Sequence, residues 1–338
     1  MNNNRNSNFE LLRIIAIVMI TAYHYVVHGA TDMAITSGGG SIFLNICSLW
    51  GKAGVNIFCL LTGFMLVRKE NISYGKLKTV EAQILFYTLL GLIVGFIFGK
   101  HIGLGALTKT IMPVVFGHYW YMTAYVIVFL LSPYINILIK NIDKDSFWEL
   151  LLICYVVWSI IPFITVREHT GMYWSQFIWF VVMYMTGAYI RIVPARFSKR
   201  FYVNTLWLSN IGLILSVVAL SILSLKYEVI VPYIPYFRWS NSPFVIAICI
   251  SMMRLADIVP AKSVSWINFL SSLVLGIYLF QENIFFQDIC WNDWFNNSIP
   301  SSILQGIVHI IVSVAGVCII GGTIDYLRSK IFKLLRLS

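Results

Sequence analysis

Long apolar runs follow one another along almost the whole chain, and most charged residues lie in the short stretches between them. The runs do not alternate between apolar and polar positions, as the strands of a membrane barrel do. Backbone groups inside a bilayer must bond to one another, and about 20 apolar residues are enough to cross the hydrocarbon as a helix. The pattern therefore predicts ten membrane-spanning helices, at residues 9–28, 42–66, 82–98, 118–138, 147–165, 174–191, 206–225, 243–259, 264–287 and 301–324.

The composition also indicates a membrane protein. The 338 residues are 59% hydrophobic and only 11% charged, whereas a soluble domain averages about 25% charged residues. The longest connections between predicted spans are residues 99–117 and 226–242, which leaves no room for a separate soluble domain. We therefore predict an all-α integral membrane protein, a bundle of about ten transmembrane helices that forms a single domain over residues 1–338.

The basic residues predict the orientation of this bundle. If the N-terminus is cytoplasmic, eighteen of the 24 lysine and arginine residues lie at cytoplasmic span ends, as the positive-inside rule requires. Both termini are then cytoplasmic. The net charge of +10 is explained by residues that face anionic membrane lipids, so the charge does not indicate nucleic-acid binding.

The first apolar run could also be a secretory signal peptide. However, Glu10 precedes the run and no small-residue cleavage site follows it cleanly, so an uncleaved first span is the preferred interpretation. The chain is then a multi-pass protein of the cell membrane, and we expect the plasma membrane of a bacterium.

The six cysteines lie mostly inside predicted spans and form no Cys-x-x-Cys pair. This spacing does not indicate a zinc site or a redox motif. We expect buried structural thiols and no bound metal.

The first span carries two polar groups that are unusual in a membrane. Arg13 and His24 are eleven residues apart, which places both on one face of a helix at an axial separation of about 16 Å. Glu10 lies one turn before Arg13 and can pair with it. This face has a cation near the cytoplasmic end and a proton acceptor deeper in the bundle, which is a candidate site. A structural interpretation is also open, in which Arg13 anchors the span and His24 bonds a backbone carbonyl.

Two segments resemble the acyltransferase 3 family of membrane-bound O-acyltransferases. They are "FELLRIIAIVMITAYH", which contains Glu10, Arg13 and His24, and "GVNIFCLLTGF" at residues 54–64, in which Thr62 replaces the family's usual serine. Trp120 and Tyr121 match a later family motif. The chain departs from the family pattern at two positions, where Gln281 stands in place of a common histidine and Asn71 in place of the second arginine after Arg68.

The resemblance implies an acyltransferase that takes an acetyl or other short acyl group from cytoplasmic acyl-coenzyme A. The acceptor would be a hydroxyl of a cell-surface polysaccharide of the cell envelope or of its lipid-linked precursor. Arg13, Arg68 and Lys69 are candidates to bind the phosphates of coenzyme A. His24 is the candidate catalytic residue, either as a general base or as a carrier of the acyl group.

Other polar and aromatic residues are candidates for the walls of the same pocket. Aromatic rings stack on sugars, whereas amides and carboxylates bind sugar hydroxyls, although aromatic residues also collect at membrane interfaces without any ligand. Glu282, in the outer third of the ninth predicted span, is the acid most expected to face the cavity. The full set of pocket candidates is Glu10, Asn56, Thr62, His118, Trp120, Tyr121, Gln281 and Glu282.

Two other classes of function fit the predicted spans. A secondary transporter or a flippase of a lipid-linked sugar also has many spans with scattered polar residues, but the inverted repeats typical of transporters are not evident here. A membrane scaffold without chemistry would need neither the Arg13–His24 face nor the glycine-rich second span.

Overall fold

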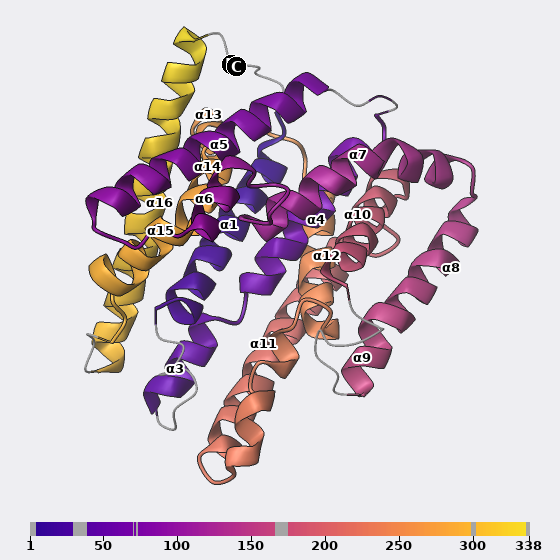
Figure 1. The fold of residues 1–338 in the computed structure, drawn as a ribbon. Helices are drawn as coiled ribbons and strands as arrows, with labels where there is room; N and C mark the ends of the chain where they lie inside the picture. The colour runs from indigo at the N-terminus through magenta and orange to yellow at the C-terminus, as the bar shows by residue number, and fades with distance from the viewer. Residues whose placement is uncertain are drawn as a thin grey trace.

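The structure, a computed structural model, describes residues 5–29, 39–69, 71, 74–165, 175–298 and 302–335. Within these ranges the chain is helical and contains no strand (Figure 1). The helices that correspond to the predicted spans are α1 (Ser7–Val27), α3 (Gly39–Cys47) with α4 (Gly51–Leu66), α5 (Tyr74–Ile97), α7 (Trp120–Lys140), α8 (Lys144–Tyr155) with α9 (Ile161–Ile164), α10 (Gln176–Ile192), α11 (Lys199–Ser224), α12 (Pro243–Ile258), α13 (Ser265–Ser272) with α14 (Val274–Gln281), and α16 (Ile303–Leu334).

Eight segments in the described part of the chain are helical, long and apolar enough to cross a membrane, which confirms an all-α protein with many spans. A ninth is a bent pair, in which Ser265–Gln281 and Ile284–Trp294 meet at 80°. The ninth predicted span, residues 264–287, corresponds to most of this pair, and the chain bends between Gln281 and Ile284. The sixth predicted span corresponds to α10, which is apolar but only 17 residues long. The number of spans and the side of the termini remain predictions.

Short helices occupy the two long connections. Helix α6 (Leu104–Ile111) lies between α5 and α7, and two turns of 3-10 helix, Glu228–Tyr233 and Tyr236–Arg238, lie between α11 and α12. After α14 the chain bends into α15 (Ile284–Asp288), which continues as a π-helical turn.

Glycines allow α4 to pack in direct backbone contact with two neighbours. A Cβ atom at Gly63 would lie 1.9 Å from the carbonyl oxygen of Tyr184, and one at Gly187 would lie 2.0 Å from that of Leu60, so α4 and α10 touch through their backbones. A Cβ at Gly54 would lie 2.5 Å from the carbonyl oxygen of Ala16 in α1. Small residues at such crossings are the usual means of close helix packing in membranes.

Helices α1 and α4 run in opposite directions. The rings of Phe9 and Phe64 pack with their centroids 4.5 Å apart near one end, whereas Gly51 approaches Tyr23 near the other. The start of α4 therefore lies beside the end of α1, and Lys69, just after α4, lies toward the start of α1.

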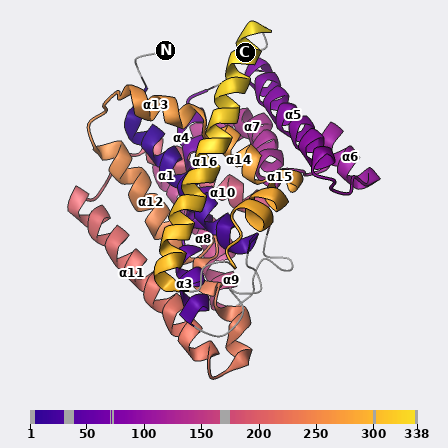
Figure 2. The ribbon, with the colours of Figure 1, turned by 90° about the vertical axis from the view of Figure 1, so that its left-hand side faces the viewer.

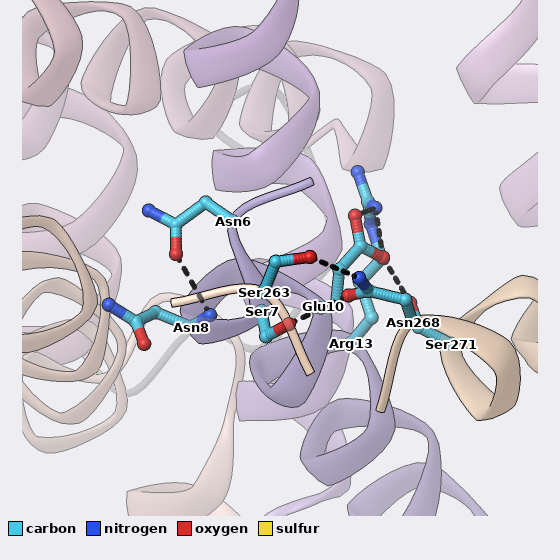
Figure 3. Close-up of polar contacts among 8 residues, drawn as sticks. All are labelled: Asn6, Ser7, Asn8, Glu10, Arg13, Ser263, Asn268 and Ser271. Atoms are coloured by element: carbon cyan, nitrogen blue, oxygen red, sulfur yellow. Dashed lines mark hydrogen bonds and ion pairs between the residues drawn. The ribbon is translucent and has the colours of Figure 1, made fainter. Parts of the chain in front are cut away.

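The start of α1 is fixed to the segment that leads into α13 (Figure 3). The Asn6 side chain caps α1 by accepting a hydrogen bond from the backbone nitrogen of Asn8, 3.0 Å away. The Ser7 hydroxyl donates to Oδ1 of Asn268 (2.8 Å) and accepts from the backbone nitrogen of Val264 (2.7 Å). These bonds hold α1 beside α13, which determines how α1 faces α14 further along.

A buried carboxylate holds α5 against α16. Asp325 accepts hydrogen bonds from Nε2 of Gln83 (2.8 Å), the hydroxyl of Tyr87 (3.3 Å) and Nε of Arg328 (2.7 Å). Figure 2 shows α5 beside the C-terminal part of α16. The start of α5, including Lys76, contributes to the cavity described below, so this cluster helps to position one wall of that cavity.

Candidate active site

A cavity of about 800 Å³ lies among α1, α4, α5, α7, α13 and α14. Helix α1, together with His28 that caps its end, lines the cavity from Glu10 to His28. The rise over these eighteen steps along the helix is about 27 Å, which is most of the thickness of the hydrocarbon core. The residues from α1 face the cavity at helical spacing, and they include both Arg13 and His24. The two groups that the sequence places on one helix face therefore line one continuous space.

One end of the cavity, here called the basic end, is lined by Arg5, Arg13, Lys69 and Lys76. Arg13 donates through Nη1 to both carboxylate oxygens of Glu10, each at 2.7 Å, and Glu10 also accepts from the hydroxyl of Ser271 (Figure 3). This pairing uses one nitrogen of the guanidinium. Within the described residues, Nε and Nη2 of Arg13 have no other protein acceptor, so they are available to a ligand.

The basic end carries more positive charge than its carboxylate can neutralise. Of the cations that line it, only Arg13 pairs with an acid among the described residues. Partial burial and the neighbouring charge of Lys76 hold the pKa of Lys69 below its usual value. An anion bound between these side chains would relieve their mutual repulsion, which is the electrostatic condition for a phosphate site.

Further along the cavity, His24 pairs with Glu282. Nε2 of His24 lies 2.8 Å from Oε1 of Glu282, and both side chains are largely buried. The pair joins α1 to the residue that caps the end of α14. Nδ1 of His24 is buried and has no hydrogen-bond partner among the described residues. If the Nε2–H group donates a hydrogen bond to the carboxylate, Nδ1 keeps its lone pair and can accept a proton.

The opposite end, here called the far end, is lined by Tyr23, His28 and Lys52. His28 follows His24 by one helical turn, and the centroids of the two rings are 4.7 Å apart. The nitrogen of Lys52 lies over the ring of Tyr23, 5.2 Å from its centroid. This end thus offers imidazole, phenol and ammonium groups close to the His24–Glu282 pair.

His24, His28 and Glu282 also form the one group of possible metal ligands found among the described residues. Their ligand atoms all lie within 4.8 Å of one another, and two histidines with a carboxylate are a known ligand set for zinc. The direct hydrogen bond between His24 and Glu282 already satisfies one atom of each partner, and the sequence predicts no metal. Removal of metal ions with a chelator distinguishes the two interpretations.

The middle of the cavity is aromatic. Trp120 and Tyr121 lie at the start of α7, and Tyr278 lies in α14; the rings of Tyr121 and Tyr278 pack edge to face, 5.6 Å apart. Thr62 lines the same region, but its hydroxyl donates to the carbonyl of Phe58 (2.8 Å). This part of the cavity wall is therefore mostly apolar, with few polar atoms.

The structure brings together eight of the twelve residues that the sequence predicts for the site. They are Glu10, Arg13, His24, Thr62, Lys69, Trp120, Tyr121 and Glu282.

The other four do not line the cavity. Asn56 is fully buried, and it links α4 to its neighbours by donating to the carbonyl of Ser240 (2.7 Å) and accepting from Nε1 of Trp179 (3.0 Å). Arg68 is exposed beside the basic end. His118 and Gln281 are buried outside the cavity, and their side chains have no hydrogen-bond partner among the described residues.

Several cavity residues were not among the sequence candidates. His28 could have been found, because it follows His24 by four residues and so lies on the same helix face. Tyr278 stands four residues before Glu282 and could have been found in the same way. Lys52 and Lys76 carry no local signal, since they line the cavity only because α4 and α5 pack beside α1.

The comparison with known families agrees with this geometry. The chain matches the family named Acyl_transf_3, described as "Acyltransferase domain", over residues 6–322. No curated protein and no solved structure matches it significantly. The family match covers nearly the whole chain, including all the helices that line the cavity. The chain therefore belongs to the acyltransferase 3 family, as the motifs around Arg13, His24 and Gly54 predict, and it is a multi-pass membrane protein with an acyltransferase domain.

Proposed function

We propose that this protein transfers an acetyl or other short acyl group from acyl-coenzyme A to a hydroxyl of a cell-surface or lipid-linked glycan. The observation that carries the proposal is the single cavity that connects the Arg13 side chain to the His24–Glu282 pair. Such a space lets a donor bound at one end meet an acceptor bound at the other. The family match supports acyl transfer.

The basic end suits the phosphates of coenzyme A. Arg13, Arg5, Lys69 and Lys76 supply cations there, and the predicted topology places this end at the cytoplasm, where acyl-coenzyme A is found. Charge-assisted hydrogen bonds from guanidinium to phosphate are among the stronger polar contacts in proteins. The extended pantetheine arm would follow the aromatic middle of the cavity and bring the thioester near His24, about 16 Å further along α1.

The His24–Glu282 pair suits the removal of a proton from the acceptor. Glu282 accepts a hydrogen bond from the Nε2–H group of His24 and thereby orients the ring, so that Nδ1 can act as the base. The carboxylate also stabilises the imidazolium that forms when Nδ1 takes the proton from the attacking hydroxyl. Glu282 is then a positioning residue and His24 is the catalytic residue.

The proposal is tested by following labelled acetyl-coenzyme A added to membranes from cells that contain the natural acceptor. We expect label in the surface glycan with the wild-type protein, and a decrease of at least about a hundredfold with His24→Gln, because a general base contributes about 10²–10⁴-fold. His309→Gln is the matched control. His309 bonds the hydroxyl of Tyr25 and does not line the cavity, so this variant should keep most of the activity.

Four outcomes of this experiment and of its EDTA arm would contradict parts of the proposal. Equal labelling by His24→Gln would remove His24 from the mechanism. Absence of labelling with acetyl-, succinyl- and other short acyl-coenzyme A would contradict acyl transfer and favour the transporter. Loss of activity in EDTA and its recovery with zinc would favour a metal at His24, His28 and Glu282, whereas we expect EDTA to have no effect. Label retained on the wild-type protein but absent from His24→Gln would identify His24 as an acyl carrier.

A further inference from the structure

Two buried polar atoms on the cavity wall have no hydrogen-bond partner among the described residues. One is Nδ1 of His24, which the proposed mechanism uses, and the other is the hydroxyl of Tyr278. A buried hydroxyl without a partner costs about 1–3 kcal/mol, and an unsatisfied group in a native structure often marks a catalytic role. The Tyr278 hydroxyl therefore needs an explanation that packing does not provide.

Tyr278 lies between the two ends of the proposed reaction path. Helices α1 and α14 run side by side in the same direction, because Glu10 bonds Ser271 near the basic end and His24 bonds Glu282 further along. Tyr278 is one turn before Glu282, whose backbone nitrogen bonds the Tyr278 carbonyl at 3.1 Å. It is therefore displaced by about 6 Å from Glu282 toward the basic end, the side from which the thioester would arrive.

The neighbouring rings hold Tyr278 in place. Its centroid lies 5.6 Å from that of Tyr121 and 6.2 Å from that of Tyr119, and the residue as a whole is buried. Two other hydroxyls of the cavity wall are already used by the protein, since Thr62 donates to the carbonyl of Phe58 and Ser271 to Glu10. Tyr278 thus lines the cavity with a ring that is fixed in position and a hydroxyl that has no acceptor among the described residues.

We propose that the Tyr278 hydroxyl donates a hydrogen bond to the carbonyl oxygen of the thioester and stabilises the oxyanion formed during acyl transfer. This inference rests on the proposed function. It assigns Tyr278 as a second catalytic residue, which supplies a donor on the side of the donor substrate while His24 accepts a proton on the side of the acceptor.

The step balances as follows. The acceptor oxygen attacks the thioester carbon and forms a C–O bond, its proton moves to Nδ1 of His24, and the carbonyl electron pair moves onto oxygen, where the Tyr278 hydroxyl binds it. The oxyanion then restores the C=O bond, the C–S bond breaks, and the coenzyme A thiolate leaves and takes the proton from His24. A donor aimed at the developing oxyanion contributes about 10²–10³-fold to the rate.

The test replaces only the hydroxyl, with Tyr278→Phe, and measures kcat and KM for acetyl-coenzyme A in the full-length protein in membranes. We expect kcat to fall about 10²–10³-fold, while KM for acetyl-coenzyme A changes by less than about threefold, because an interaction made in the transition state lowers kcat without weakening substrate binding. Tyr155→Phe is the matched control. Tyr155 does not line the cavity, and its hydroxyl bonds that of Thr186 at 2.7 Å, so this variant should keep its kcat within about threefold.

A second variant tests whether the hydroxyl acts by its acidity or by its packing. Site-specific 3-fluorotyrosine at position 278 keeps the shape of the ring and makes the hydroxyl a stronger donor, so it should retain at least the wild-type kcat. Wild-type kcat in Tyr278→Phe would overturn the inference, as would an increase in KM with unchanged kcat. An inactive wild-type protein would instead contradict the proposed function. If Tyr278→Phe does not fold, a kcat well below wild type in the fluorotyrosine protein would overturn the inference.

Discussion

At the scale of single residues, the charged groups that α1 places in the cavity have polar partners, one within α1 and others on neighbouring helices. Glu10 bonds Arg13 within α1 and Ser271 from α13, while His24 bonds Glu282. A charge in the membrane interior is costly unless it is paired, so these partners explain how α1 keeps two polar groups inside an apolar bundle. They also leave part of each group available, since Arg13 uses one nitrogen and His24 one ring atom.

Arg13 provides a test of donor binding. Arg13→Gln alone would leave the buried Glu10 without its cation, so the informative variant is Glu10→Gln with Arg13→Gln, which removes both charges. We expect KM for acetyl-coenzyme A to rise at least about tenfold, because a hydrogen bond to a charged group is worth about 1.5–3 kcal/mol.

Two further measurements complete this test. Glu10→Gln alone should raise KM far less than the double variant, and heat-induced unfolding in detergent should show that both variants fold. An unchanged KM in the folded double variant would mean that the other cations of the basic end bind the phosphates.

The sequence predicted only part of this residue-scale arrangement. The separation of eleven residues between Arg13 and His24 is enough to place both on one face, because helical geometry is local. The partners Ser271 and Glu282 are about 260 residues away along the chain, so no local pattern could assign them. Asn56 and Gln281 are polar residues in apolar spans, as His24 is, but they point into packing between helices. Which face of a span lines a cavity depends on how the helices pack, and the sequence alone does not predict this.

At the scale of helices, close packing around α4 determines where the cavity lies. Backbone contact of α4 with α10 and α1 at Gly63, Gly187 and Gly54 leaves the other faces of α1 and α4 to line the cavity. The apolar runs predicted the presence of these helices. The break between α3 and α4 and the bend of 80° after α14 were not predicted, because the apolar pattern continues through both.

Gly63 provides a test of this packing. In Gly63→Ala the new Cβ would meet the carbonyl oxygen of Tyr184 at 1.9 Å, so α4 and α10 must separate. We expect a loss of at least about 1–3 kcal/mol in the free energy of unfolding, the usual cost of overpacking a core, seen as a lower unfolding temperature in detergent.

The matched control is Gly75→Ala, in the first turn of α5, where an added Cβ would meet nothing within 4 Å. This variant should be neutral or slightly stabilising, since alanine favours a helix by about 0.5–1 kcal/mol over glycine. Equal stability of the two variants would show that α4 and α10 are less tightly packed than described.

At the scale of the whole molecule, one cavity reaches across most of the bundle with a basic end and a far end. The asymmetry has a functional meaning only if the basic end faces the cytoplasm, where acyl-coenzyme A is present. That orientation comes from the distribution of lysine and arginine residues, not from the packing of the helices. The topology is therefore the whole-molecule prediction with the largest consequence for function.

Reporter fusions test this topology. Alkaline phosphatase is active only outside the cytoplasm. Green fluorescent protein fluoresces in the cytoplasm but not after export through the general secretion route. We expect fluorescence and no phosphatase activity for fusions after Leu335, and phosphatase activity for fusions within the connection after α5, near Lys100. The opposite pattern would place the basic end outside the cell and contradict coenzyme A as the donor.

One continuous helix, α1, carries both Arg13 and His24. Their separation therefore does not depend on how neighbouring helices shift during a reaction cycle. The distance between the guanidinium and the imidazole is set by the rise of this one helix. Inserting a single residue between them would turn the imidazole by about 100° around the helix axis and so direct it away from the cavity. The length of this one segment is therefore constrained by the positions that both side chains must reach.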